Sequence, residues 1–169
     1  MSDIRTAQKR AWFYHPSFFI TIGALLYALL VIIIQNGDPL ALVTLGTRAT
    51  QGISAEDGGT EGYDGQFVYF IARDPISAPF FIARGGDIPE YRFQRILLPL
   101  FGRGLALGNE SLIPFTLLAV NLVALWAGSI ALERLLVGFG MSRWYILGYA
   151  LTIAIFGTVR LSLPEVLAY

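Results

Sequence analysis

Three charged residues in the middle of the chain have side chains suited to group-transfer chemistry. Asp64 lies in the string GYDG at residues 62–65, and its carboxylate can accept a proton from a hydroxyl group. Arg92 and Arg95 lie one turn apart if their segment is helical. Because a guanidinium fork matches the oxygen atoms of phosphate, this pair predicts a basic face that meets phosphate groups.

Each of these residues also has a structural interpretation. Asp64 can cap the helix that follows it or form part of an Asp-Gly turn. Arg92 and Arg95 can extend toward lipid headgroups, or they can pair with Asp87 and Glu90. The sequence alone leaves these alternatives open.

Metal chemistry finds little support in the sequence. The chain has no cysteine and a single histidine, His15, which excludes disulfides and Cys-rich or His-rich metal sites. The loop carboxylates do not follow the calcium-loop pattern, because Gly59 stands where an oxygen ligand belongs and Val68 where the final glutamate belongs. These carboxylates are Glu56, Asp57, Glu61 and Asp64. We therefore expect no metal site and no cofactor, although a divalent metal is compatible with the sequence.

The composition indicates that the elements carrying these residues belong to a membrane protein. Apolar residues make up 55% of the 169 residues, charged residues make up 14%, and the mean hydropathy is +0.61. The formal net charge is zero, so no nucleic-acid partner is expected, since such proteins carry a basic stripe. We predict an all-α integral membrane protein with one membrane domain over residues 1–169.

Three apolar segments are candidates for transmembrane helices. They cover residues 18–34, 113–132 and 144–159, and they leave residues 35–112 as a long first loop. Glu133 and Arg134 are expected to close the second span. The third segment is short, because about 20 residues are needed to cross the hydrocarbon core. A buried or re-entrant segment is the alternative for it.

The residues before the first segment predict the orientation. Arg5, Lys9 and Arg10 form a basic cluster, and the aromatic residues 12–14 follow at the expected headgroup level. The N-terminus is therefore expected in the cytoplasm and the first loop on the extracytoplasmic side. The six arginines of the loop do not contradict this, because the positive-inside rule is weak for long loops. A signal peptide is the rival interpretation, but its apolar region usually has only about 7–15 residues.

Two short amphipathic helices are predicted in the first loop. The first covers Phe67–Ala72, with Asp64 as its cap, and its apolar face is expected on the membrane surface or against the transmembrane helices. The second begins with a cap at Asp87 and with Pro89 in its first turn, and Pro99 is expected to kink or interrupt it. Its apolar stripe is expected to consist of Phe93, Ile96, Leu97 and Leu100.

Two strings of the loop carry a resemblance to a known family. They are GYDGQFVYFIARDP at residues 62–75 and YRFQRILLPL at residues 91–100. Following a first membrane helix in this order, they resemble the N-terminal part of bacterial polytopic membrane glycosyltransferases of the GT-C type. The first loop is also similar to that of the mannosyltransferases of GPI-anchor synthesis, which carry an aromatic-Asp motif there.

The resemblance implies an activity and roles for the candidate residues. It implies transfer of a sugar from a polyprenyl-phosphate donor to an acceptor hydroxyl, on the outer side of the bacterial inner membrane. Asp64 matches the family's essential aspartate, so its implied role is general base. Arg92 and Arg95 would stabilise the departing lipid phosphate. Members of this family cross the membrane many more times than three, so we expect the chain to be the N-terminal portion of a longer protein.

A non-enzymatic function is the alternative. The chain would then be a small membrane subunit or scaffold whose outer loop binds a partner, a lipid or other membrane subunits. A transporter is less favoured, because no predicted span has an ionisable residue at its centre, where transport sites usually need one.

Overall fold

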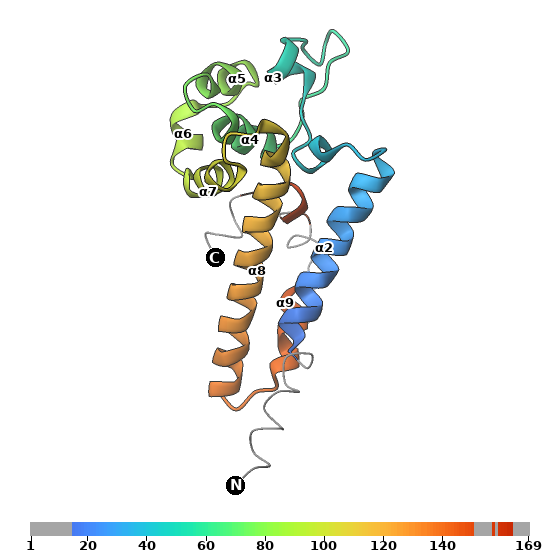
Figure 1. The fold of residues 1–169 in the computed structure, drawn as a ribbon, viewed down its shortest axis with the longest axis vertical. Helices are drawn as coiled ribbons and strands as arrows, with labels where there is room; N and C mark the ends of the chain where they lie inside the picture. Colours follow the sequence, from blue (N-terminus) through green and yellow to red (C-terminus); the bar gives the residue numbers. More distant parts are fainter. Residues whose placement is uncertain (1–14, 151–156, 158, 164–169) are drawn as a thin grey trace.

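The computed structural model describes residues 15–150, 157 and 159–163, and the regular elements among them are all helices, with no strand. Two long helices, α2 (Pro16–Ile34) and α8 (Ile113–Gly138), pack along each other, and short helices gather at one end of α8 (Figure 1). We call α2 and α8 the stem, and residues 39–106 the head.

The stem consists of two apolar helices with a seam of small and polar residues. By length and composition, α2 and the helical run Glu110–Gly138 could each cross a bilayer. α2 starts at Pro16, whose missing N–H costs nothing at a first helical position. It ends in a turn where Asn36 and Gly37 adopt positive φ angles of 57° and 84°. The buried seam is formed by Ser17, Ile20, Ala24 and Ala28 from α2 and by Asn121, Leu125, Ser129 and Glu133 from α8.

The second apolar helix is longer than predicted. Instead of closing the span, Glu133 lies inside α8 and is only 4% exposed. Its carboxylate accepts the backbone N–H of Ser17 at 2.6 Å and contacts Nδ1 of His15 at 2.8 Å. These partners satisfy the buried charge, which is why the helix continues through a position that the sequence pattern marks as its end.

Within the third predicted span, residues 144–159, residues 151–156 and 158 lie outside the described residues, so the span as a whole stays a prediction. Its first part forms the 3-10 helix η4 (Arg143–Tyr145) and the helix α9 (Ile146–Ala150). Beyond it, Ser162 Oγ donates to the carbonyl of Leu42 at 3.4 Å, and Asn121 Nδ2 donates to the carbonyl of Leu163 at 3.3 Å. The described residues after the third segment therefore contact both the head and α8.

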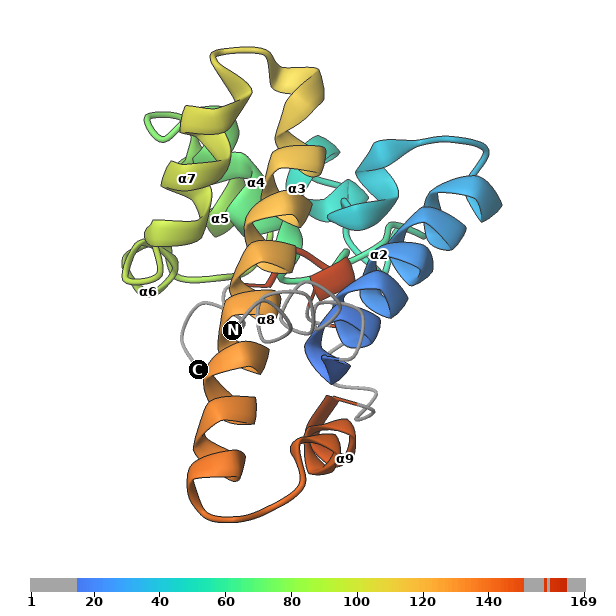
Figure 2. The ribbon, with the colours of Figure 1, turned by 60° about the horizontal axis from the view of Figure 1, so that its bottom comes forward.

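The first loop is more helical than the two predicted helices. Within residues 35–112, all of which the structure describes, the two 3-10 helices are η2 (Pro39–Leu42) and η3 (Glu110–Leu112). The α-helices are α3 (Thr47–Gln51), α4 (Gly65–Arg73), α5 (Ala78–Arg84), α6 (Pro89–Phe93) and α7 (Leu97–Ala106). α7 packs along the N-terminal part of α8 (Figure 2).

The helix predicted at residues 67–72 forms, as α4, and of the two positions predicted for its apolar face the one against a long apolar helix is confirmed, because α4 packs against α8 in the core of the head. Every residue from Gly65 to Ala72 is buried, because α4 packs against α5, α7 and α8. The ring of Phe70 stacks on that of Phe81 with centroids 5.0 Å apart. A helix with apolar side chains on most of its sides needs such complete cover.

The second predicted helix is divided into α6 and α7, and Pro99 does not kink it. The break falls at residues 94–96, so Pro99 lies in the first turn of α7, where backbone N–H groups have no intrahelical partner anyway. The predicted apolar stripe is divided too. Phe93 and Ile96 pack against the core, whereas Leu97 and Leu100 are 61% and 48% exposed.

Candidate functional site

Asp64 and Arg92 form a two-pronged ion pair between the start of α4 and α6. Arg92 Nη1 donates to Asp64 Oδ2 and Arg92 Nη2 donates to Asp64 Oδ1, each at 3.0 Å. The side chain of Asp64 is 53% exposed and that of Arg92 is 12% exposed. This fork geometry is the strongest form of an arginine–carboxylate contact, and it leaves one side of the Asp64 carboxylate open to a ligand.

The predicted helix cap by Asp64 is not formed. Asp64 precedes α4 directly, but its side chain accepts no hydrogen bond from the first turn. Its own backbone is helical, with φ −55° and ψ −30°, whereas a capping residue normally has extended backbone angles. The carboxylate is therefore available to Arg92, 28 residues further along the chain.

Asp87 is the second carboxylate on Arg92. Arg92 Nε donates to Asp87 Oδ2 at 2.7 Å, and Arg92 Nη2 donates to the same oxygen. The predicted capping role of Asp87 is wrong: Ile88 holds the N-cap position of α6, and the backbone N–H that Asp87 accepts is that of Ile88 itself, at 2.7 Å, not one in the first turn of the helix. The sequence alternative in which Arg92 pairs with Asp87 is confirmed. Arg92 has five N–H donors, and four of them point to Asp64 and Asp87.

Aromatic rings make cation–π contacts with the guanidinium groups of Arg92 and Arg95. Arg92 Cζ lies 4.7 Å from the ring centroid of Phe67, which is buried on α4, and 5.5 Å from that of Tyr91. Arg95 Cζ lies 5.4 Å from the ring centroid of Tyr91, and Arg95 Nη2 donates to the Tyr91 hydroxyl at 3.1 Å. Tyr91 therefore links the two arginines that the sequence paired.

The charges of this cluster stabilise one another. Burial alone would lower the pKa of Arg92, but the hydrogen bonds to Asp64 and Asp87 outweigh it, and the pKa lies above the usual arginine value. Burial likewise favours a raised pKa at Asp87, but the hydrogen bonds from Arg92 and from the Ile88 N–H outweigh it. The pKa of Asp87 therefore lies below its ordinary value.

The residues around Asp64 have structural reasons for their types. Gln66 is buried; its Oε1 accepts the N–H of Gly46 at 3.0 Å, and its Nε2 donates to the carbonyl of Glu61 at 2.9 Å. A Cβ atom on Gly65 would lie 1.9 Å from the carbonyl oxygen of Leu161. Gly65 and Gln66 therefore anchor the string, which leaves Asp64 as its exposed acidic member.

Four other arginines of the head satisfy groups of the loop itself. Arg84 donates to the carbonyls of Ala49 and Thr50 at the end of α3, and Arg103 donates to those of Ala72 and Arg73 at the end of α4. Arg48 pairs with Glu61 and Arg73 pairs with Glu110. These arginines hold the short helices together, which the sequence did not indicate.

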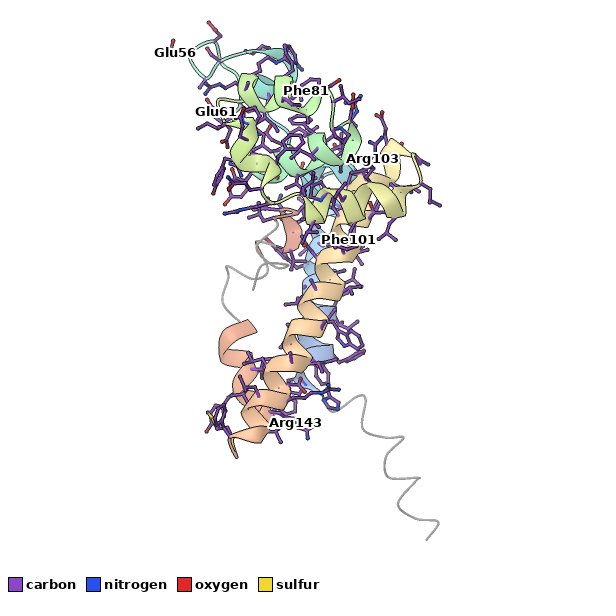
Figure 3. The ribbon with its side chains drawn as sticks, turned by 90° about the vertical axis from the view of Figure 1, so that its left-hand side faces the viewer. Glu56, Glu61, Phe81, Phe101, Arg103 and Arg143 are labelled. Carbon is purple, nitrogen blue, oxygen red and sulfur yellow. The ribbon has the colours of Figure 1, made fainter. Side chains whose placement is uncertain are left out.

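The carboxylates at the far end of the head do not gather into a metal site. Within residues 15–150, 157 and 159–163, no group of three or more His, Cys, Asp or Glu side chains could hold a metal ion. Glu56 and Glu61 lie at the end of the head farthest from Arg143, which marks the opposite end of the stem (Figure 3).

The structure joins Asp64 to Arg92 directly and adds Arg95 through Tyr91. Nothing in the sequence indicated that Phe67 lies against the Arg92 guanidinium or that Tyr91 lies between the two arginines. Comparison of the chain with protein-family models, curated proteins and solved structures found no match.

Proposed function

We propose that this chain forms the N-terminal part of a membrane glycosyltransferase of the GT-C type. The proposed enzyme takes a sugar from a polyprenyl-phosphate donor and transfers it to an acceptor hydroxyl on the extracytoplasmic side of the bacterial inner membrane. The stem would cross the membrane, with its His15 end facing the cytoplasm and the head outside.

The ion pair between Asp64 and Arg92 is the observation that carries this proposal. Asp64 belongs to the first motif string and Arg92 to the second, and the two side chains meet at 3.0 Å although many residues separate them. The two strings that carry the family resemblance therefore touch in space through this ion pair, which supports the proposal. If the two strings resembled the family only by chance, nothing would require Asp64 of the first string to contact Arg92 of the second.

The proposed reaction assigns one role to each charged group. An oxygen of Asp64 accepts the proton of the acceptor hydroxyl, while the oxygen of that hydroxyl forms a bond to the anomeric carbon of the donor. The bond between that carbon and the phosphate oxygen breaks, and its electron pair leaves with the polyprenyl phosphate. Arg95 and the remaining Nη1–H of Arg92 would stabilise the charge on this phosphate.

The two stem helices support the membrane part of the proposal. The large side chains of α2 that face outward are apolar, with Leu26 60% exposed and Ile33 72% exposed. The same holds for Val123 of α8, at 63%. Such surfaces are unfavourable in water and match lipid tails. Residues 113–132 cover about 30 Å along the helix axis, which is the thickness of a hydrocarbon core.

The test is the Asp64→Asn variant in the longest available form of the protein. Sugar transfer in membranes should fall about 10²- to 10⁴-fold, the usual contribution of a general base. Asp57→Asn is the matched control, because the Asp57 carboxylate bonds only within its own exposed turn, to Ser54. Unchanged sugar transfer by the Asp64→Asn variant would show that Asp64 is not the base.

The non-enzymatic alternative also has an observation in its favour. Three large apolar side chains around α5 are exposed on the head: Ile76 at 91%, Phe80 at 62% and Ile88 at 64%. They suit contact with another membrane subunit. In that case Phe80→Asp would release a stoichiometric partner from the purified complex, and Asp64→Asn would leave the function of the complex unchanged.

A further inference from the structure

We infer that Asp87 is a positioning residue for the proposed base: it holds the guanidinium of Arg92, and Arg92 holds the carboxylate of Asp64. This inference rests on the proposed function and deepens it. Sequence analysis treated Asp87 as a helix cap, and the structure removes that role from it.

The two carboxylates on Arg92 differ in what surrounds them. The Asp87 side chain is 23% exposed, and it accepts hydrogen bonds from Arg92 Nε, from Arg92 Nη2 and from the N–H of Ile88. The Asp64 side chain is 53% exposed and accepts only the two bonds of the Arg92 fork. Asp87 is therefore the anchored partner, and Asp64 is the partner that a ligand can reach.

The plane of the guanidinium is fixed from two directions. Asp87 binds its Nε edge, while the ring of Phe67 lies under its face, with Cζ 4.7 Å from the centroid. Phe67 belongs to α4, where every residue from Gly65 to Ala72 is buried. Its ring therefore cannot shift without disturbing the packed core. With both constraints present, only the Nη1–Nη2 edge is left to meet Asp64, which defines the direction of that carboxylate.

This arrangement assigns a function to each side of the Asp64 carboxylate. A carboxylate has about four lone-pair sites on its two oxygens, and the Arg92 fork uses two of them. The others remain for the proton of an acceptor hydroxyl. A half-exposed side chain loses conformational freedom when it reaches the reactive geometry. Positioning of this kind makes that loss smaller.

The experiment compares Asp87→Asn, Arg92→Lys and the control Asp57→Asn in the full-length protein in membranes. The probes are undecaprenyl-phosphate-linked hexoses and pentoses with radiolabelled sugar. We expect Asp87→Asn to lower kcat about 10- to 100-fold and to leave KM for the lipid donor within about twofold. Arg92→Lys keeps the charge but cannot offer a fork, so it should lose kcat similarly. Asp57→Asn should behave as the wild type.

Defined outcomes would overturn the inference. Unchanged kcat in Asp87→Asn, together with loss of transfer in Asp64→Asn, would show that Asp87 does not position the base. A raised KM with unchanged kcat would indicate donor binding instead. If the wild type transfers sugar from no donor, or Asp64→Asn keeps full activity, the proposed function fails and not the geometry behind the inference.

A thermal double-mutant cycle of Asp64→Ala and Asp87→Ala gives a second readout that does not need activity. Because both side chains bind the same guanidinium, their effects on the melting temperature should be non-additive. Additive effects would show that Arg92 does not couple the two carboxylates, and this would overturn the inference whatever the activity assays show.

Discussion

The stem and the head each hold distant segments together with a carboxylate, but they use it differently. In the stem, Glu133 reaches from α8 to the first turn of α2, and its side chain is only 5% exposed. In the head, Asp64 reaches Arg92 and keeps about half of its side chain in contact with solvent. The comparison separates a carboxylate that only joins helices from one that can also meet a ligand.

The two regions also differ in which side of them is polar. The stem buries small and polar residues beside Ile20 and Leu125 and exposes large apolar side chains such as Leu26, whereas the head has an aromatic core and charged groups near its surface. An apolar exterior matches lipid, and a charged exterior matches water or headgroups. We therefore expect a substitution in one region and a matched substitution in the other to differ in their effect on stability.

The largest effect on stability is expected from Gly65→Ala in the head. The new Cβ would lie 1.9 Å from the carbonyl oxygen of Leu161, a backbone contact that cannot be relieved by turning a side chain. We expect a loss of about 3 kcal/mol or more, measured by thermal unfolding in detergent. Gly128→Ala is the matched control in α8, where a Cβ meets nothing within 4 Å. It should be neutral or should stabilise by up to about 1 kcal/mol.

A smaller effect is expected when the stem carboxylate is removed. Glu133→Ala leaves the Ser17 N–H without its acceptor inside the seam. We expect a loss of about 2–3 kcal/mol, as for other buried hydrogen bonds to charged groups. Glu110→Ala, which breaks the exposed pair with Arg73, should cost no more than about 1 kcal/mol. Equal losses in the two variants would contradict the distinction between joining and exposed carboxylates.

The smallest effect is the contribution of Asp87 to the stability of the head in acid. The pKa of Asp87 is lower in the folded protein than its ordinary 3.8, so the unfolded chain takes up the proton at a higher pH. The contribution of Asp87 to the free energy of unfolding is therefore present above about pH 4, and it is lost as the pH falls through the pKa of Asp87 in the folded protein. Asp87→Asn should flatten the loss of head stability below pH 4.

The two regions can be followed separately in that titration. The tryptophans are Trp12, Trp126 and Trp144, and none of them lies in the head. Tryptophan fluorescence therefore reports on the rest of the chain, and hydrogen exchange of the α4 amides reports on the head. An identical acid response of α4 in the wild type and in Asp87→Asn would contradict the prediction.

The sequence indicated the apolar helices better than it indicated the loop. Runs of apolar residues with few charges predicted α2 and the start of α8 because helix formation there depends on local composition. Local composition also predicted that the second helix ends at Glu133. That prediction was wrong because no local signal shows that Ser17 and His15 will satisfy the charge of the Glu133 carboxylate. Asp87 illustrates the same limit in the head, because its local pattern fits a helix cap equally well.

By itself, the sequence determined that the protein is helical; it predicted three apolar spans, of which the structure describes two as helices long enough for a bilayer, and it singled out Asp64, Arg92 and Arg95 as candidates. These features follow from residue types and short spacings. Only the tertiary structure decided that Asp64 and Asp87 converge on Arg92 over Phe67. That convergence depends on the break between α6 and α7 and on the burial of α4. Both are set by packing between segments distant in the chain, which no local pattern encodes.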